Sequence, residues 1–163
     1  MTANGPAIRT AARADLAALA ALERRCFVLD AQSRRSLRHL LTRAHAANYL
    51  VELGGAPAGH VCVLFRRNSR LARVYSLAVD PAARGRGYAR ALLAAAERAA
   101  LAAGCARIAS EVRLSNQASQ TLFASAAYAP VRRLPDYYPD HGGGFEDGMR
   151  LEKALAGESQ ADA

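Results

Sequence analysis

The chain has 163 residues and a formal net charge of +8, and this length predicts one domain with a sizeable buried core. It has no apolar run long enough for a membrane-spanning helix, and Arg9, Arg13 and Asp15 interrupt the N-terminal apolar region, which argues against a signal peptide. Cysteines 26, 62 and 105 lack metal-ligand spacing. We therefore expect small core side chains in a reduced, cytoplasmic protein without a metal site.

Hydrophobic periodicity and turn residues predict alternating strands and helices. In chain order we expect strand 7–10, helix 16–26, a helix from 33, strands 49–53, 60–66 and 71–79, a helix between 87 and 104, strand 107–112, helix 116–126, and strands 128–132 and 145–153. Glycine-rich residues 54–59 predict a hairpin loop, and residues 135–144 a mobile loop. The order β-α-α-β-β-β-α-β-α-β-β indicates an α/β fold with a mixed central sheet flanked by helices. We expect one domain over residues 1–155 and a disordered tail over 156–163.

The charge is distributed unevenly along the chain. Residues 1–133 carry a net charge of +13 and residues 134–163 one of −5. A basic body suits a polyanionic ligand and an acidic C-terminal part suits a cationic amine, and the alternative is that both are solvated faces. A nucleic-acid partner is disfavoured, because aromatic residues do not alternate with the arginines.

The most informative segment is a strand followed by an arginine- and glycine-rich turn and a long helix. Gly85 and Gly87 lack Cβ atoms where the backbone must bend, so amide N–H groups can turn toward one point. That point lies at a helix N-terminus, which favours an anion. Arg84, Arg86 and Arg90 add positive charge beside it. The segment matches neither the Walker pattern nor G-x-G-x-x-G. It predicts a pyrophosphate site, and the alternative is an arginine-rich surface loop.

The same segment carries a resemblance to a known family. Arg84-x-x-Gly87-x-Ala89 resembles the Q/R-x-x-G-x-G/A signature of the GNAT superfamily of acyl-CoA-dependent N-acyltransferases. The resemblance extends from about Ile8 to Leu155. It implies the GNAT fold, acetyl-CoA as co-substrate, and direct acetyl transfer to a primary amine without a metal or a covalent enzyme intermediate.

Two later blocks narrow the resemblance. Residues 111–116 and 122–128 look like the E-V-R-x-S-N…L-Y-E-x-x-G-F block of bacterial ribosomal-protein N-terminal alanine acetyltransferases, and residues 132–139 resemble that group's R-R-x-Y-Y-P segment. This implies a protein or peptide N-terminal α-amine as the acceptor. The alternatives are a small-molecule amine acetyltransferase and a catalytically weak relative that binds coenzyme A. The sequence leaves the oligomeric state open.

The resemblance also implies which residues hold the cofactor. One strand edge pairs with the pantetheine arm, the turn holds the pyrophosphate, and an asparagine contacts the cofactor. These residues are Leu77, Ala78 and Val79 in the strand, Arg84, Gly85, Arg86, Gly87, Tyr88, Ala89 and Arg90 in the turn and helix start, and Asn116. An ordinary helix N-cap is an equally good interpretation of Asn116, and one residue can do both.

The resemblance implies that Glu111 is the base that takes the ammonium proton. The alternative is a cross-strand ion-pair partner for Arg107 or Arg113. The family's acid that reprotonates the thiolate is the tyrosine of L-Y-E-x-x-G-F, and this chain has Phe123 there. Either the acid is absent or another tyrosine supplies it, and the candidates are Tyr138, Tyr137 and Tyr75.

Overall fold

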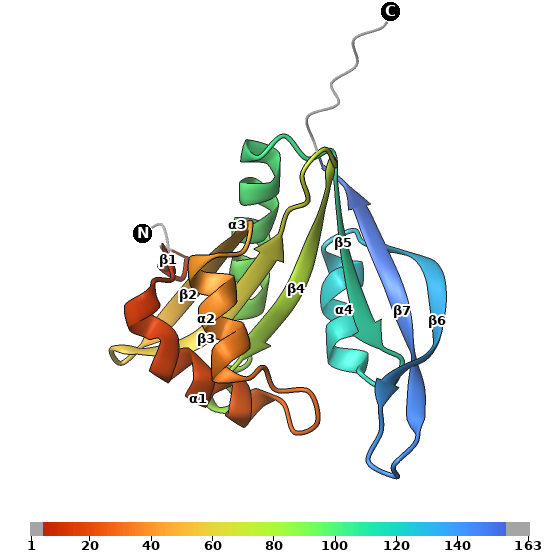
Figure 1. The fold of residues 1–163 in the computed structure, drawn as a ribbon, viewed down its shortest axis with the longest axis horizontal. Helices are drawn as coiled ribbons and strands as arrows, with labels where there is room; N and C mark the ends of the chain where they lie inside the picture. The colour runs from red at the N-terminus through yellow and green to blue at the C-terminus, as the bar shows by residue number, and fades with distance from the viewer. Residues whose placement is uncertain (1–4, 156–163) are drawn as a thin grey trace, which may run out of the picture.

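The computed structural model describes residues 5–155, in which strands and helices follow the expected order of an α/β fold (Figure 1). The strands are β1 (Ile8–Thr10), β2 (Ala46–Leu53), β3 (Ala56–Leu64), β4 (Leu71–Val79), β5 (Arg107–Arg113), β6 (Ala129–Pro139) and β7 (Phe145–Ala154). The helices are α1 (Leu16–Cys26), α2 (Arg34–Thr42), α3 (Tyr88–Ala102) and α4 (Gln117–Ser125), with 3₁₀ turns at Arg13–Asp15 and Pro81–Ala83. The tail expected at 156–163 lies outside the described residues. Within residues 5–155, no helix is both long and apolar enough to cross a membrane.

The strands form one seven-stranded sheet in the order β1-β2-β3-β4-β5-β7-β6. The β4–β5 pair is parallel and the other neighbouring pairs are antiparallel, so the prediction of a mixed sheet is confirmed. Pairing between β4 and β5 is limited to residues 71–74 and 107–110. Beyond those residues the two strands diverge (Figure 1). A gap therefore opens in the middle of the sheet.

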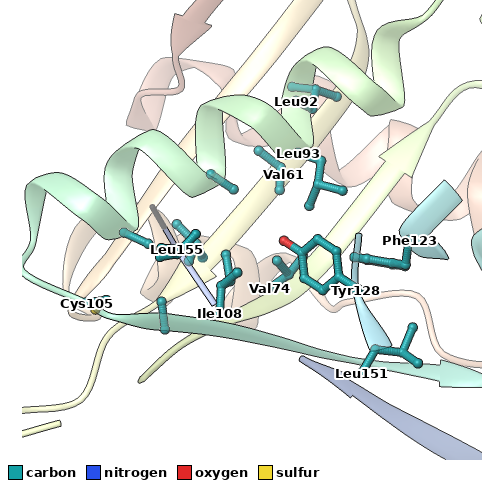
Figure 2. Packing of buried hydrophobic residues seen from close by; sticks show 14 of the residues in the cluster. Val61, Val74, Leu92, Leu93, Cys105, Ile108, Phe123, Tyr128, Leu151 and Leu155 are labelled. Atoms are coloured by element: carbon teal, nitrogen blue, oxygen red, sulfur yellow. The ribbon is translucent and has the colours of Figure 1, made fainter. Parts of the chain in front are cut away.

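Hydrophobic cores lie on both faces of the sheet. On one face, Leu92 and Leu93 of α3 and Phe123 of α4 pack with Val74 and Tyr128 (Figure 2). The rings of Phe123 and Tyr128 meet edge to face, with centroids 4.9 Å apart. On the opposite face, α1 and α2 bury leucines against each other and against β2, namely Leu16, Leu19, Leu22, Leu37 and Leu50.

The helix starts around the gap follow from local residue chemistry. Ser33 Oγ accepts the Ser36 amide at 3.1 Å and begins α2, and Asn116 Oδ1 accepts the Ser119 amide at 3.0 Å and begins α4. Gly87, at the start of α3, has a φ of +79°, which a residue with a Cβ adopts only with strain. The predicted N-cap role of Asn116 is confirmed.

The hairpin between β2 and β3 has a shorter turn than we predicted. The expected loop 54–59 is wrong beyond its first two residues, since β3 already begins at Ala56. Gly54 and Gly55 have φ values of +63° and +82°. Two consecutive residues with positive φ make a two-residue turn whose twist matches the flanking strands. Pro57 and Gly59 lie within the strand, although their residue types predicted a loop.

The predicted mobile loop 135–144 is also wrong over residues 135–139, because β6 continues to Pro139. The register with β7 shifts between Leu134 and Tyr138, and Asp136 has a φ of +47°. At this irregularity the Asp147 carboxylate accepts the Asp136 amide at 2.9 Å and Arg133 Nε at 2.6 Å. A side chain of β7 thus replaces ladder hydrogen bonds and carries the strand across the bulge.

Candidate active site

The larger of two cavities at the gap lies on the α3 and α4 side and encloses about 580 Å³. Its lining comes from residues 26–30, the end of β4, the turn before α3, the start of α4 and the β6–β7 turn. The predicted cofactor residues in this lining are Leu77, Ala78, Val79, Arg84, Gly85, Gly87, Tyr88, Ala89, Arg90 and Asn116. Arg86 is exposed and is not among the lining residues.

The C-terminal half of β4 presents to this cavity a backbone edge that does not pair with β5. The Asp80 amide donates to the Ala58 carbonyl at 2.8 Å, and residues of an antiparallel pair alternate between hydrogen-bonded and non-hydrogen-bonded positions. Leu77 and Val79 therefore turn their N–H and C=O groups away from β3 and toward the gap. The Val79 carbonyl accepts a weak hydrogen bond from Cys26 Sγ at 3.4 Å. An extended ligand that carries amide groups can form hydrogen bonds with the backbone along this edge.

The turn before α3 gives the cavity an anion cradle. Gly85 and Gly87 both have a φ of +79°, and a Cβ built at either meets no atom within 4 Å. The backbone there borders open space at the N-terminus of α3, where unpaired amides favour a phosphate group. Of the predicted arginines, Arg84 Nε reaches the Val79 carbonyl at 3.4 Å. Arg90 instead fastens α3 to α4 through Ser125 Oγ at 2.9 Å and the Ser125 carbonyl at 3.0 Å.

The smaller cavity, of about 370 Å³, adjoins the start of α2. Its lining brings together residues from five separate segments, which are Asp30, Ala31, Gln32, Ser36, Arg73, Tyr75, Glu111, Tyr137 and Tyr138. Both predicted catalytic residues, Glu111 and Tyr138, are among them. So are Tyr75 and Tyr137, the other two candidate acids. Phe123 lines neither cavity, because it is buried in the core of Figure 2.

Glu111 is held by two arginines, although not by the pair that the sequence suggested. Its Oε2 accepts Arg73 Nε at 2.9 Å and its Oε1 accepts Arg150 Nη1 at 3.1 Å, and its side chain is 8% exposed. The expected partners Arg107 and Arg113 pair with other carboxylates. Those alternatives considered only neighbours in sequence, whereas β4 and β7 supply the actual partners across the sheet.

Tyr138 presents a protonated hydroxyl close to Glu111. Burial and the nearby Glu111 charge raise the Tyr138 pKa well above its ordinary value. Its ring packs against Tyr137 with centroids 4.8 Å apart, and the Arg113 guanidinium lies 4.7 Å from the ring centroid. A Cβ added at Gly148 would come within 2.8 Å of this ring, so the glycine makes room for it. The hydroxyl can donate a proton but does not ionise at neutral pH.

An ion-pair network connects the two cavities. Asp30, in the α1–α2 connection, lines both of them, and its Oδ2 accepts Arg113 Nη2 at 3.0 Å. Arg113 Nη1 also donates to Glu146 Oε1 at 2.9 Å and to the Pro139 carbonyl at 2.7 Å. Since Asp147 pairs with Arg133, the acidic C-terminal part has less unpaired charge for an amine than its composition suggests. Sequence reasoning missed Asp30, whose partner is 83 residues away.

Glu23 is a second functional-site residue that sequence reasoning missed. Its carboxylate is buried in α1, where Oε1 accepts Ser76 Oγ and Oε2 accepts the Gln32 amide, both at 3.1 Å. Burial raises its pKa. These bonds fasten the lining segment around Gln32 to β4. A glutamate on the apolar face of a predicted helix was the signal available in the sequence.

The free cysteines agree with the expectation of core side chains at two positions. Cys62 and Cys105 are buried, whereas Cys26 is half-buried and lines the larger cavity. Burial raises the Cys62 thiol pKa to about 12. Within residues 5–155, no three His, Cys, Asp or Glu side chains are grouped for a metal ion.

Comparisons with known proteins agree with this geometry. A segment of 78 residues, 48% of this chain, is 36% identical to the [ribosomal protein bS18]-alanine N-acetyltransferase of Haemophilus ducreyi, and it spans 54% of that protein. The crystal structure of the ribosomal-protein-S18-alanine N-acetyltransferase of Escherichia coli superposes with a TM-score of 0.85 at 23% identity, covering 96% of this chain and 98% of that one. Arabidopsis thaliana NAA60, crystallised with acetyl-CoA, gives a TM-score of 0.80 at 19% identity, covering 93% and 99%. The profile of the Acetyltransferase (GNAT) family matches residues 16–128, and the chain belongs to this family.

Proposed function

We propose that the protein is an acetyl-CoA-dependent N-acetyltransferase whose acceptor is the N-terminal α-amine of a protein or peptide. One observation carries the proposal. The two cavities adjoin the same gap between β4 and β5, one with an anion cradle and a strand edge that does not pair with β5, the other with a carboxylate and tyrosines. Asp30 lines both, so a cofactor in one and an amine in the other would approach each other at the gap.

The chemistry of the residues that line the larger cavity suits coenzyme A. When bound, acetyl-CoA supplies the activated acetyl thioester. The amides at Gly85 to Tyr88 would hold its pyrophosphate, since the backbone there is open and no Cβ fills the cradle. Backbone groups of Leu77 and Val79 would pair with the pantetheine amides, because they face the gap. Asn116 uses Oδ1 as the N-cap of α4 and keeps its amide N–H₂ for the cofactor.

The smaller cavity provides the proton chemistry. An ammonium must lose a proton before its nitrogen attacks, and Glu111 is the base. Each of its oxygens accepts one arginine, which leaves a further lone pair on each for the amine or a bridging water. Tyr138 is the acid that protonates the departing thiolate, because its hydroxyl stays protonated at neutral pH. Direct attack by the neutral amine completes the transfer.

Amine basicity favours an N-terminal acceptor over a lysine side chain. The reacting species is the neutral amine. Deprotonation at pH 7 costs about 1 kcal/mol for an α-amino group and about 4.6 kcal/mol for lysine, a difference of about 3.5 kcal/mol. A site with one base and one tyrosine has limited means to offset it. The similarity to alanine N-acetyltransferases supports the same preference.

A competition between two peptides tests the proposal. One has a free N-terminus and blocked lysines, and the other has a blocked N-terminus and free lysines. With acetyl-CoA, we expect mass spectrometry to detect faster acetylation of the first. Faster acetylation of the second would identify a lysine acetyltransferase. If neither peptide reacts, a panel of small amines separates a small-molecule acetyltransferase from a protein that binds coenzyme A without turnover.

A further inference from the structure

Arg73 is a cation in the smaller cavity with hydrogen-bonding capacity to spare. Its Nε donates to Glu111 Oε2 at 2.9 Å, and its two terminal amino groups have no partner among residues 5–155. The side chain keeps 39% of its surface exposed and lines the cavity. The guanidinium also lies 5.5 Å from the centroid of the Tyr75 ring, which holds it in place.

Two further features of the same cavity favour an anion. Ser36, in the first turn of α2, lines the cavity, so the positive end of a nine-residue helix adjoins it. Gln32 Oε1 accepts Ser36 Oγ at 3.1 Å, which leaves the Gln32 amide nitrogen as a donor.

The carboxylates of this cavity are already occupied by arginines. Asp30 pairs with Arg113, and Glu111 pairs with both Arg73 and Arg150. Glu111 is thus shared between two arginines, and Arg73 contacts only one of its oxygens. An arginine whose two terminal amino groups are free matches a carboxylate in shape, since both are planar and two-pronged.

We propose that Arg73 binds a carboxylate of the acceptor, so that the preferred acceptor carries a carboxylate next to its reacting amine. The inference rests on the proposed function, because it takes Glu111 as the base. Arg73 Nε lies only 2.9 Å from Glu111 Oε2, so an amine at Glu111 has its neighbouring groups beside Arg73. Two sources offer this chemistry: a free α-amino acid, or a peptide with an acidic residue near its N-terminus.

Calorimetry on the protein loaded with coenzyme A tests the inference by binding alone. The probes are two peptides that begin with alanine and differ only in their second residue, aspartate or asparagine. We expect the aspartate peptide to bind about tenfold tighter, as is typical of a charge-assisted hydrogen-bonded pair. In Arg73→Gln the ratio of the two affinities falls to within about twofold. A ratio within one variant cancels any general loss of folded protein.

Arg107→Gln is the matched control. Arg107 is an arginine of β5 paired with Glu152 and lines neither cavity, so we expect the wild-type ratio. Should Arg73→Gln fold poorly, Arg73→Lys keeps the charge and removes the two-pronged contact, and we expect a smaller preference than in the wild type. Equal affinities for both peptides in the wild type, or a preference that survives in both Arg73 variants, would overturn the inference.

A second pair of probes separates the sources. Free alanine and alaninamide differ only in the carboxylate. A preference for the aspartate peptide alone identifies an acidic side chain, a preference for free alanine alone identifies an α-amino acid, and both preferences mean that the cavity accepts either. Acetylation of the same four compounds tests the proposed function separately. If the binding preferences are observed but none of the compounds is acetylated, the proposed function is wrong, whereas the carboxylate site at Arg73 is supported.

Discussion

The larger cavity takes its cradle and strand edge from one continuous stretch, residues 77–90, whereas the smaller cavity brings together Asp30, Arg73, Glu111 and Tyr138 from distant parts of the chain. The first presents mainly backbone groups, at β4 and at two glycines with positive φ. The second presents side chains held by ion pairs. A backbone site tolerates changes in side chains but not an added Cβ, while a side-chain site depends on each charge.

We expect the largest effect on activity when the smaller cavity loses its proposed base. Glu111→Gln keeps the shape of the side chain and removes the proton acceptor, so we expect kcat to fall by about 10²–10⁴-fold. Affinity for acetyl-CoA should change little, because Glu111 does not line the larger cavity. Steady-state kinetics and calorimetry measure the two quantities. Glu152→Gln removes another carboxylate paired with Arg150 and is the control; if both variants lose activity equally, Glu111 is only structural.

In the larger cavity, we expect an added Cβ to weaken the binding of coenzyme A. Gly87→Val places a branched side chain at the cradle, and the loss of one charge-assisted contact predicts an affinity for coenzyme A about 10–100-fold weaker. Gly143→Val is a matched control, because Gly143 has a φ of +81° and open space around it but does not line the cavity. The two variants share the backbone strain. Equal affinities in both, measured by calorimetry, would contradict the cradle.

The buried hydrogen bonds between Asn48, His60 and α2 predict that the free energy of unfolding decreases at acidic pH. Asn48 donates to the Leu40 carbonyl of α2 and accepts from His60 Nε2, each at 3.0 Å, and His60 Nδ1 has no hydrogen-bond partner among residues 5–155. Burial lowers the His60 pKa from 6.5 to about 4. Below pH 6.5 the unfolded chain binds a proton that the folded chain refuses, so stability is lost as the pH falls from 6.5 toward 4.

This linkage gives a loss of about 2 kcal/mol in unfolding free energy between pH 7.5 and pH 5, since one pKa unit corresponds to about 1.4 kcal/mol. Urea unfolding at the two pH values measures it. His60→Gln should reduce the difference, and His39→Gln, on the exposed side of α2, should leave it unchanged. The same pH dependence in wild type and His60→Gln would assign it to other groups.

Removal of the Tyr138 hydroxyl tests whether this residue is the acid that protonates the thiolate. Thiolate is a tolerable leaving group at neutral pH, because a thiol has a pKa of about 8.5, so Tyr138→Phe should lower kcat only about tenfold. The affinity for acetyl-CoA should stay constant. Tyr137→Phe retains the ring that packs against Tyr138 and serves as the comparison. A larger effect at Tyr137 would move the acid to that residue.

The smallest expected effect lies just after the end of α4. Ala127 has a φ of +71°, at the position where the L-Y-E-x-x-G-F block has glycine. Relief of this strain outweighs the added backbone entropy of glycine, so Ala127→Gly should stabilise the fold by about 0.5–1 kcal/mol. Ala124→Gly, inside α4, should destabilise it by a similar amount. Thermal unfolding of both variants measures these opposite signs, and a destabilised Ala127→Gly would contradict the argument.

The sequence by itself was sufficient for the order of elements, the α/β class and the glycine-rich turn before α3. The spacing of hydrophobic residues follows the local geometry of a helix or strand, so it locates these elements in the sequence. For β4, the predicted bounds Leu71 and Val79 are confirmed at both ends. The cradle was also predictable, since glycines, arginines and a helix start lie within a few residues of each other. Strand ends were less predictable. Pro135 to Pro139 looked like a loop, because the carboxylate that bridges the bulge belongs to Asp147 on another strand.

Only the tertiary structure decided which side chains meet in the smaller cavity. Glu111 was identified through its motif, but its partners Arg73 and Arg150 are 38 and 39 residues away. The sequence did not point to Asp30, which lines the site, or to Glu23, which binds the backbone of the lining residue Gln32. Sequence patterns report contacts made within one turn or one strand pair, because backbone geometry sets those spacings. Pairing across a sheet and around a gap depends on strand order, divergence and packing, which no local spacing encodes.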